Sequence, residues 1–287
     1  MLTPQSSRRQ FAMALGTQAM SALAATRWAA PLAPLTPWLL SGCGHAPAVA
    51  SEQDRKLLAP SGTLRIGVYL GSPTSMVKSP TGQVRGLSVE LGQALATLLG
   101  VPWRLVEQPR VASVLDALKA GQIDFTVTNA TPARAQDMLF SAPLVELELG
   151  YLVMTGSRIS DIDGVDQADV RIGVSQGSSS QAALTQRLKN ARVLPAASLQ
   201  IAAEMLKAGR IDAFATNKAI LSEMADGLPG ARLLDGHWGF EQLAIAIPKG
   251  REAAMPLVGR FADEVRDQGL VKRAAERAGL RGLRGGT

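Results

Sequence analysis

The sequence contains very few of the side chains that build disulfides and metal centres. Among its 287 residues Cys43 is the only cysteine, and His45 and His237 are the only histidines. A disulfide within one chain is therefore excluded, and so is a metal site built from thiolate and imidazole ligands. We predict a chain that binds no metal and no cofactor.

Aromatic side chains are also scarce, at 4% of the sequence, and no basic stretch is interleaved with them. The formal net charge is +6, but Arg8, Arg9 and Arg27 lie in a segment that we expect to be removed, which leaves about +3. Charge therefore gives no reason to expect a nucleic-acid partner. Past residue 60 no apolar run approaches the roughly 18 residues of a membrane span, although the 46% apolar content suffices for a sizeable core.

Acidic residues are absent before Glu52, as is typical of an export leader. The segment Ser7-Arg8-Arg9-Gln10-Phe11 resembles a twin-arginine signal. The mildly apolar stretch after it carries Arg27, which is unlike a membrane-spanning helix. We predict that residues 1–42 are a twin-arginine lipoprotein signal peptide, so that the protein is periplasmic.

Leu40-Ser41-Gly42-Cys43 resembles a lipoprotein processing box, in which Cys43 becomes the lipidated first residue and anchors the protein to the membrane. The alternative is ordinary cleavage after Ala48-Val49-Ala50, which has the small-x-small form. Residues 43–60 contain alanine, proline and charge without a period, so we predict that they form a tether.

One stretch of the mature chain occurs twice. Leu118–Phe125 (LKAGQIDF) returns 88 residues later as Leu206–Ala213 (LKAGRIDA), and each copy is followed at the same distance by Thr-Asn. Each copy predicts a helix that ends at a glycine, then a buried strand, then polar residues. Open α/β sheets bind ligands at the carboxyl ends of their strands. We therefore expect two similar lobes that present matching polar edges to one cleft.

The rest of the mature chain alternates strands with helices, which indicates βαβ units and parallel-rich sheets flanked by helices. Two extended runs, near 145–154 and 241–248, are predicted to cross between the lobes. We place lobe 1 at residues 61–148 and 245–287, and lobe 2 at residues 149–244. Strands are predicted at 63–70, 103–106, 123–128, 170–175 and 211–215, and helices at 88–99, 111–120, 198–206, 252–268 and 270–278.

Two further helix starts suggest an anion site. Thr131 caps a predicted helix and Pro132 suits its first position, so Arg134 stands in the first turn, where the helix dipole disfavours a cation. A cation in that place favours a nearby anion, although a solvated surface arginine is the alternative. In the second lobe Ser178 and Gln181 fit a capping box beside a glycine, which suits a carboxylate or phosphate, the alternative being a plain capped helix.

With these residues in place, roughly residues 60–280 resemble the extracytoplasmic solute-binding proteins, family 3, the receptors of amino-acid-type ABC importers. The order and spacing of several motifs carry this resemblance. The motifs are Gly62–Gly67 (GTLRIG), Gly82–Leu91 (GQVRGLSVEL), Ala120–Asp124 (AGQID), Thr131–Arg134 (TPAR), Phe140–Pro143 (FSAP), Ile172–Ser178 (IGVSQGS) and Gly209–Asp212 (GRID).

The resemblance implies a hinged, two-lobe periplasmic-binding-protein fold of type II. It further implies that Arg134 clamps the carboxylate of a ligand, a task that suits a guanidinium fork. By the same resemblance Ser178 and Ser179 cover this anion from the other lobe. Asn129 supports the ligand beside Arg134, in place of a usual serine or threonine.

The sequence departs from the family pattern at two points. Where the amino-acid receptors place an aspartate against the ligand's ammonium group, this chain has Asn217, which lacks the charge. The aromatic residue that usually follows the first strand is replaced by a Ser72–Ser75 segment. We therefore add Ser72 and Tyr69 to the candidate ligand contacts, although a core or rim tyrosine is the alternative role of Tyr69.

The resemblance implies a monomeric receptor that binds a small anionic or zwitterionic solute by lobe closure and delivers it to ABC importer membrane subunits. One alternative is a prephenate- or arogenate-type dehydratase, which needs a general acid in the cleft. Glu146, Glu241 and His237 have the right chemistry, but we expect each at the hinge or surface and predict no catalytic residue. The other alternative is a periplasmic ligand sensor.

Overall fold

The structure is a computed structural model that describes residues 50–284. The predicted signal peptide and the proposed lipidation site at Cys43 lie outside this range. Of the helices within it, none combines the length and the apolar content that a membrane crossing requires.

The first described element is α1 (Glu52–Leu58), which occupies part of the predicted tether. The side chain of Ser51 accepts a hydrogen bond from the Asp54 amide, and the Asp54 carboxylate accepts one from the Ser51 amide. This reciprocal cap begins a helix whose last residue, Leu58, is fully buried in the first lobe. The prediction of a tether up to residue 60 is therefore wrong for residues 52–58, because a capped helix with one buried leucine shows almost no apolar period.

Lobe 1 is built on two parallel strands, β1 (Leu64–Tyr69) and β4 (Trp103–Gln108), which pair from Leu64 opposite Trp103 to Tyr69 opposite Gln108. A single bridge from Ile66 to Phe125 brings the chain leading to β5 to the other side of β1. The other elements of this part of the chain are the hairpin β2 (Val77–Lys78) and β3 (Val84–Arg85), the helices α2 (Leu87–Leu99), α3 (Val111–Lys119) and α4 (Pro132–Ala135), and the strands β5 (Thr126–Asn129) and β6 (Met138–Phe140).

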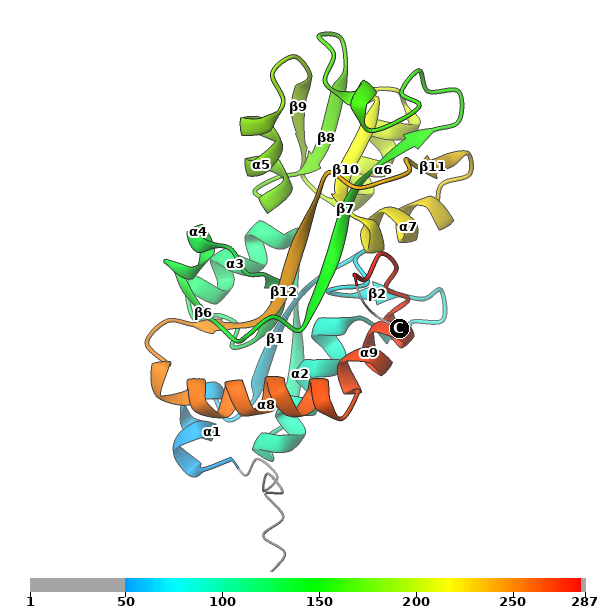
Figure 1. The fold of residues 1–287 in the computed structure, drawn as a ribbon. Coiled ribbons are helices and arrows are strands. Elements are labelled where there is room, and N and C mark those ends of the chain that lie inside the picture. Colours follow the sequence, from blue (N-terminus) through cyan, green and yellow to red (C-terminus); the bar gives the residue numbers. More distant parts are fainter. Residues whose placement is uncertain (1–49, 285–287) are drawn as a thin grey trace, which may run out of the picture. The chain divides into compact units, whose positions relative to one another are not determined.

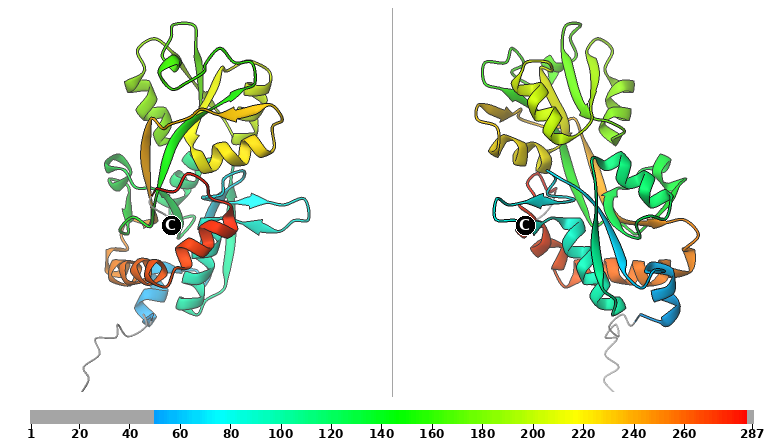
Figure 2. Two further views of the ribbon diagram at one scale, coloured as in Figure 1. Left: turned by 45° about the vertical axis from the view of Figure 1, so that its right-hand side comes forward. Right: turned by 180° about the vertical axis from the view of Figure 1, so that it is seen from behind.

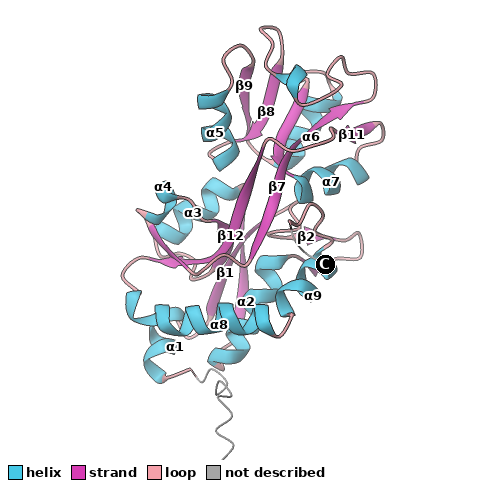
Figure 3. Cartoon of the chain, viewed as in Figure 1, coloured by secondary structure: helices cyan, strands magenta, loops and turns pink. Residues whose placement is uncertain are grey.

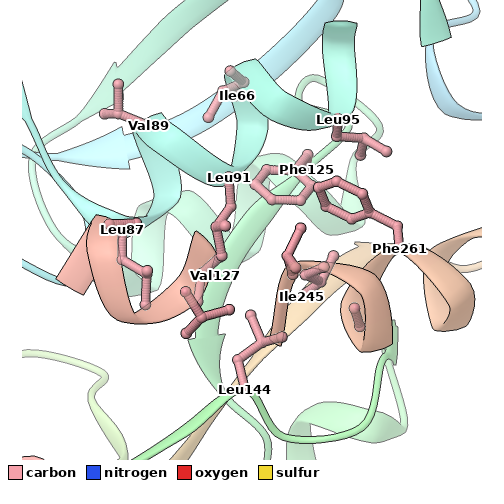
Figure 4. Packing of buried hydrophobic residues seen from close by; sticks show 14 of the residues in the cluster. Ile66, Leu87, Val89, Leu91, Leu95, Phe125, Val127, Leu144, Ile245 and Phe261 are labelled. Carbon is pink, nitrogen blue, oxygen red and sulfur yellow. The ribbon is translucent and has the colours of Figure 1, made fainter. Parts of the chain in front are cut away.

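The core of lobe 1 lies between α2 and the helices at the end of the chain. The apolar stripe of α2 is largely buried, and Gly100 ends this helix in the left-handed conformation with φ 65°. Figure 4 shows Leu95, Phe125 and Phe261 pointing toward one another. Phe261 belongs to α8 (Met255–Asp267), which follows the short 3-10 helix η2 (Glu252–Ala254) and precedes α9 (Leu270–Ala278).

One eight-stranded sheet extends through both lobes, with the central order β5-β12-β7-β10-β8-β9. Its two longest strands, β7 (Val145–Met154) and β12 (Gly239–Pro248), pair antiparallel from Val145 opposite Leu243 to Leu149 opposite Gly239. In Figure 1 these strands run side by side from one lobe to the other, and Figure 3 shows the helices gathered on either side of them. The fold is the predicted two-lobe α/β fold.

Lobe 2 surrounds the parallel strands at the far end of this sheet. Helices pack on both faces of it, and each face has its own cluster of buried apolar residues. Tyr151 and Trp238 lie in one cluster, and Phe214 lies in the other. The elements are η1 (Asp163–Val165), β8 (Arg171–Ser175), α5 (Ser179–Arg187), β9 (Arg192–Ala196), α6 (Leu199–Lys207), β10 (Ala213–Asn217), α7 (Lys218–Asp226) and β11 (Ala231–Leu233).

The sequence repeat marks the same ion pair in each lobe. In lobe 1 the Asp124 carboxylate accepts hydrogen bonds from Nε and Nη2 of Arg65, at 2.8 and 2.7 Å, and from the Arg65 amide at 3.0 Å. In lobe 2 Asp212 receives the same three bonds from Arg171, at 2.9, 2.8 and 2.8 Å. Each arginine stands at the start of its lobe's first parallel strand, so the pair ties that strand to the Gly-x-Ile-Asp segment.

After α8 and α9 the chain returns to the crossing strands (Figure 2). The amide of Glu148 on β7 donates to the carbonyl of Gly282 at 2.9 Å, and the amide of Arg284 donates to the carbonyl of Glu146, also at 2.9 Å. Leu283 thereby forms a bridge with Leu147. The end of the described chain thus forms an isolated bridge to β7 at the junction of the lobes.

Candidate functional site

A polar cavity lies where the two lobes meet, at the carboxyl ends of the parallel strands. Lobe 1 contributes the ends of β1 and β5 together with α4, lobe 2 contributes the end of β8, the start of α5 and the end of β10, and β12 adds Glu241 and Leu243. The cavity measures about 30 Å³. The lobes already touch across it, because the Asn129 side chain donates from Nδ2 to the Ser179 hydroxyl at 3.1 Å.

Arg134 enters this cavity from the single turn of α4. Thr131 caps the turn by accepting a bond from the Arg134 amide at 3.3 Å, as the sequence predicted. The guanidinium donates twice from Nη1, to the Thr128 hydroxyl and to the Asn129 carbonyl, both at 3.0 Å. Burial lowers the pKa of Arg134, and the negative charge of Glu241 opposes that shift. Both bonds leave from one nitrogen, and no residue within 50–284 accepts from Nε or Nη2, which are therefore available to another acceptor.

A buried carboxylate faces the same cavity. Glu241 on β12 is 7% exposed, and its Oε1 accepts a bond of 2.6 Å from Nδ2 of Asn217. The Oδ1 atom of Asn217 accepts from the Ile220 amide at 3.0 Å, which caps α7. Burial raises the pKa of Glu241, although the Asn217 bond and the charge of Arg134 oppose the shift.

The start of α5 lines the lobe 2 side of the cavity with serine hydroxyls. Ser178 caps the helix by accepting from the Gln181 amide at 3.1 Å. A capping box would also have the Gln181 side chain accept from the Ser178 amide. Instead its Oε1 accepts from the amide of Gly177, one residue earlier, at 2.6 Å. Ser179, on the first turn, faces Asn129 across the cavity.

Of the two remaining candidates from lobe 1, Tyr69 lines the cavity and Ser72 does not. Tyr69, the last residue of β1, lines the cavity, and burial raises the pKa of its phenol. Ser72 is fully buried, and its hydroxyl is 2.8 Å from that of Thr74. Thr74 lines the cavity where Ser72 does not. Ser72 thus lies behind the wall.

The structure therefore brings six of the seven ligand-contact candidates to one cavity: Tyr69, Asn129, Arg134, Ser178, Ser179 and Asn217. Further residues that the sequence interpretation did not name as ligand contacts also line it, among them Thr128, Thr216 and Glu241. Thr128 and Thr216 were expected at the polar edges of the cleft, and Glu241, expected at the hinge or surface, is instead buried in the cavity wall. The two threonines directly precede the asparagines of the repeat. For Glu241 the available signal was strand alternation, because Glu241 shares one face of β12 with the buried Leu243.

The charges of the cavity are balanced. Among the described residues that line it, Arg134 is the cation and Glu241 is the carboxylate, and the other lining residues are neutral at ordinary pH. No cluster of three or more His, Cys, Asp or Glu residues suited to a metal ion occurs within residues 50–284. Opposed charges, hydroxyls and amides in a small space suit a small polar molecule that carries at least one negative group.

Solved structures share this fold. An amino acid ABC transporter substrate-binding protein from Streptococcus pneumoniae, solved with bound L-arginine, superposes with a TM-score of 0.70 at 22% identity, over 80% of this chain and 98% of that chain. The ancestral amino acid-binding protein AncCDT-1, described as a precursor of cyclohexadienyl dehydratase, superposes with a TM-score of 0.68 at 25% identity, over 79% and 98%.

The sequence identifies the family directly. The family model for bacterial extracellular solute-binding proteins, family 3, matches residues 64–279. The chain belongs to this family. Its relatives include the ABC transporter glutamine-binding protein GlnH of Bacillus subtilis (strain 168), which is 26% identical over 226 residues, covering 75% of this chain and 82% of that protein. The L-arginine-binding protein of Pseudomonas aeruginosa is 26% identical over 234 residues, covering 75% and 86%.

Proposed function

We propose that this family 3 solute-binding protein is a receptor for a small carboxylate-bearing solute, an amino acid or a related organic acid. The observation that carries the proposal is the position of Arg134, a half-buried guanidinium held by one nitrogen at a polar cavity between the lobes. A carboxylate is the anion whose two oxygens match the remaining edge of that guanidinium.

Binding joins the two lobes through the ligand. Arg134 supplies its Nε and Nη2 atoms from lobe 1, and Ser178, Ser179 and the first amides of α5 face the same space from lobe 2. A solute held by both lobes stabilises their closed arrangement over any open one, which is a shift of population. We place the hinge in the crossing strands β7 and β12, between lobe 1 at 61–148 and 245–284, with α1 packed against it, and lobe 2 at 149–244.

The relatives support a role in import. GlnH is named as part of an ABC transporter, and relatives are named for glutamine or arginine. We therefore propose that the loaded receptor delivers its solute to ABC importer membrane subunits. On the same proposal the protein reaches the periplasm by the twin-arginine route and is anchored through lipidated Cys43.

Replacement of Arg134 tests the proposal. Arg134→Ala is expected to reduce affinity for the solute at least 100-fold, because it removes a charge-assisted, two-point contact in a partly desolvated site. Arg134→Lys keeps the charge but not the fork and is expected to restore only part of the affinity. Isothermal titration calorimetry on the exported, mature protein measures both effects.

The matched control is Arg104→Ala, which removes an exposed arginine of β4 that does not line the cavity. Its affinity is expected to equal that of the wild type. Wild-type affinity in Arg134→Ala, with an unchanged unfolding temperature, would contradict the proposal.

Glu241 gives one reason to consider a dehydratase, since a buried carboxyl with a raised pKa beside Arg134 has the character of a general acid. Against this, prephenate carries two carboxylates, and Arg134 is the one cation among the described residues that line the cavity. An assay that incubates the protein with prephenate and detects phenylpyruvate distinguishes a dehydratase from a solute receptor. We expect no phenylpyruvate above the rate without protein.

A further inference from the structure

Glu241 has an environment that a purely structural glutamate rarely has. Its side chain lies at the junction of the lobes with only 7% of the residue exposed, yet no arginine or lysine forms an ion pair with it within residues 50–284. Its one hydrogen bond is to Oε1 and comes from the neutral amide of Asn217. Its other oxygen, Oε2, accepts no bond from the described residues, and the residue lines the cavity.

A buried carboxylate without a full set of donors is costly, and an incoming donor lowers that cost. Arg134 is close enough for the two charges to shift each other's pKa, but no hydrogen bond joins them. A ligand that entered with a carboxylate alone would satisfy Arg134 and leave Glu241 as an uncompensated charge. A ligand with a second carboxylate would add repulsion as well.

We propose that Glu241 binds a cationic nitrogen of the ligand, so that the site selects a zwitterion of net zero charge, with its carboxylate on Arg134 and its ammonium group on Glu241. This inference rests on the proposed binding function and specifies its ligand class. Asn217 orients the acceptor by holding Oε1, and it fixes its own amide by capping α7.

The inference reverses what the sequence suggested about the part of the site that would bind an ammonium group. From the sequence, Asn217 replaces the family's aspartate and lacks the charge that faces an ammonium group. In the structure a carboxylate is present 2.6 Å from that asparagine, contributed by a different strand. The site therefore has both charges that an α-amino acid requires, on residues from β12 and α4.

The first experiment compares ligands that differ only in the nitrogen. The wild-type unfolding temperature is measured with each standard L-amino acid, and with the matched acids L-lactate, L-glycerate, L-malate and pyruvate. We expect stabilisation by amino acids with uncharged side chains, and the matched 2-hydroxy and 2-keto acids of the best binder are expected to bind about 10- to 100-fold more weakly. Equal or tighter binding of the acid without the nitrogen overturns the inference, as does the absence of any amino-acid ligand.

The second experiment moves the carboxylate. Glu241→Gln is expected to lower affinity for the best amino acid about 10- to 100-fold while leaving affinity for its hydroxy acid within a few-fold. Adding Asn217→Asp to Glu241→Gln exchanges amide and carboxylate between two side chains that touch, and aspartate still caps α7. This double variant is expected to recover amino-acid affinity.

A control variant and a separate criterion distinguish a failure of the role proposed for Glu241 from a failure of the proposed binding function. Glu107→Gln removes an exposed glutamate of β4 outside the cavity and is expected to bind as the wild type does. If Glu241→Gln loses amino acid and hydroxy acid equally, Glu241 only supports the fold of the site and the inference fails. Carboxylate binding that still depends on Arg134 would then leave the proposed function intact.

Discussion

At the scale of single residues, the site is defined by two charges that lie in one cavity without forming an ion pair. Arg134 is held by Thr128 and by a backbone carbonyl, and Glu241 is held by Asn217, so each charge is oriented by neutral partners. Neutral partners leave the charges available to a ligand. Two titratable groups within residues 50–284 interact with the charge of Glu241. The positive charge of Arg134 on α4 lowers the pKa of Glu241 against the effect of burial, and the negative charge of Glu241 adds to the rise in the pKa of the Tyr69 phenol on β1.

The raised pKa of Glu241 predicts that binding depends on pH. An ammonium group pairs with the carboxylate form, so affinity for the amino-acid ligand is expected to fall as the pH is lowered through the raised pKa, above the ordinary value of 4.5. Calorimetric titration at several pH values checks this. In Glu241→Gln the affinity is expected to stay flat over the same range, and the same decline in that variant would contradict the assignment.

The same shift affects the protein without ligand, with the opposite trend. A carboxyl whose pKa is raised on folding contributes stability that is fully present below its unfolded pKa and is lost as the pH rises through the folded pKa. The unfolding temperature of the wild type relative to Glu241→Gln is therefore expected to fall from acidic to neutral pH.

Arg134 could be singled out from the sequence as a candidate site residue, because the dipole of a helix disfavours a cation in its first turn and Arg134 stands there. Glu241 could not be assigned in the same way. Its neighbours Gln242 and Phe240 are polar or exposed, and a strand period of two does not reveal which face meets a cavity formed by distant segments. Its contact with Asn217, 24 residues away in the sequence, is the observation that supports the role proposed for it.

At the scale of elements, the two copies of the Arg–Asp pair differ in their surroundings. Asp124 is fully buried and also accepts a bond of 2.9 Å from Nη2 of Arg251, whereas the side chains of Asp212 and Arg171 are 21% and 38% exposed. Solvent screens a partly exposed pair, and an isolated buried charge is far more costly.

Asp124→Asn is therefore expected to lower the free energy of unfolding by about 3–5 kcal/mol, because two partly buried arginines lose their fully buried carboxylate partner. Asp212→Asn is expected to cost only about 1–2 kcal/mol, since water reaches that pair. Urea unfolding of the two isosteric variants measures the difference. An equal loss in both would show that burial does not set the strength of these pairs.

Elements with a strong apolar period were the most predictable. The apolar stripe of α2 and the alternate apolar residues Leu64, Ile66 and Val68 of β1 are the residues that a helix and a strand bury on one face. Both elements are present, and these residues are largely buried. Short capped elements were the least predictable. Residues 132–135 form one turn only, and residues 52–58 form a helix where a tether was expected. Their formation depends on caps and on contacts with distant residues rather than on a repeating pattern.

At the scale of the whole described chain, contacts outside the cavity also join the lobes. Arg85 of β3 donates from Nη2 to both oxygens of Glu223 on α7, at 3.0 and 2.8 Å. The pair is partly exposed, with side chains that are 37% and 22% accessible. An arrangement that moved these two residues apart would break the pair, so the pair favours the closed arrangement in which we propose that the ligand is held by both lobes.

Glu223→Gln is expected to weaken binding of the amino-acid ligand by no more than about 5-fold, the effect of a screened surface pair of under roughly 1 kcal/mol. It touches neither Arg134 nor Glu241, so the change should appear equally for every ligand of the site. Calorimetry with the best amino acid and its hydroxy acid tests this. A selective effect on one of them would contradict a role in closure.

The join between the lobes consists of paired strands instead of loose loops. From Val145 to Leu149 β7 keeps its ladder with β12, and Leu283 adds a bridge to Leu147 on the free side. A hydrogen-bonded ribbon of this kind twists readily about its long axis but resists shearing and stretching. On the proposed lobe closure, this ribbon would limit the directions in which the lobes move, so Arg134 and Glu241 would return to the same mutual orientation at each closure.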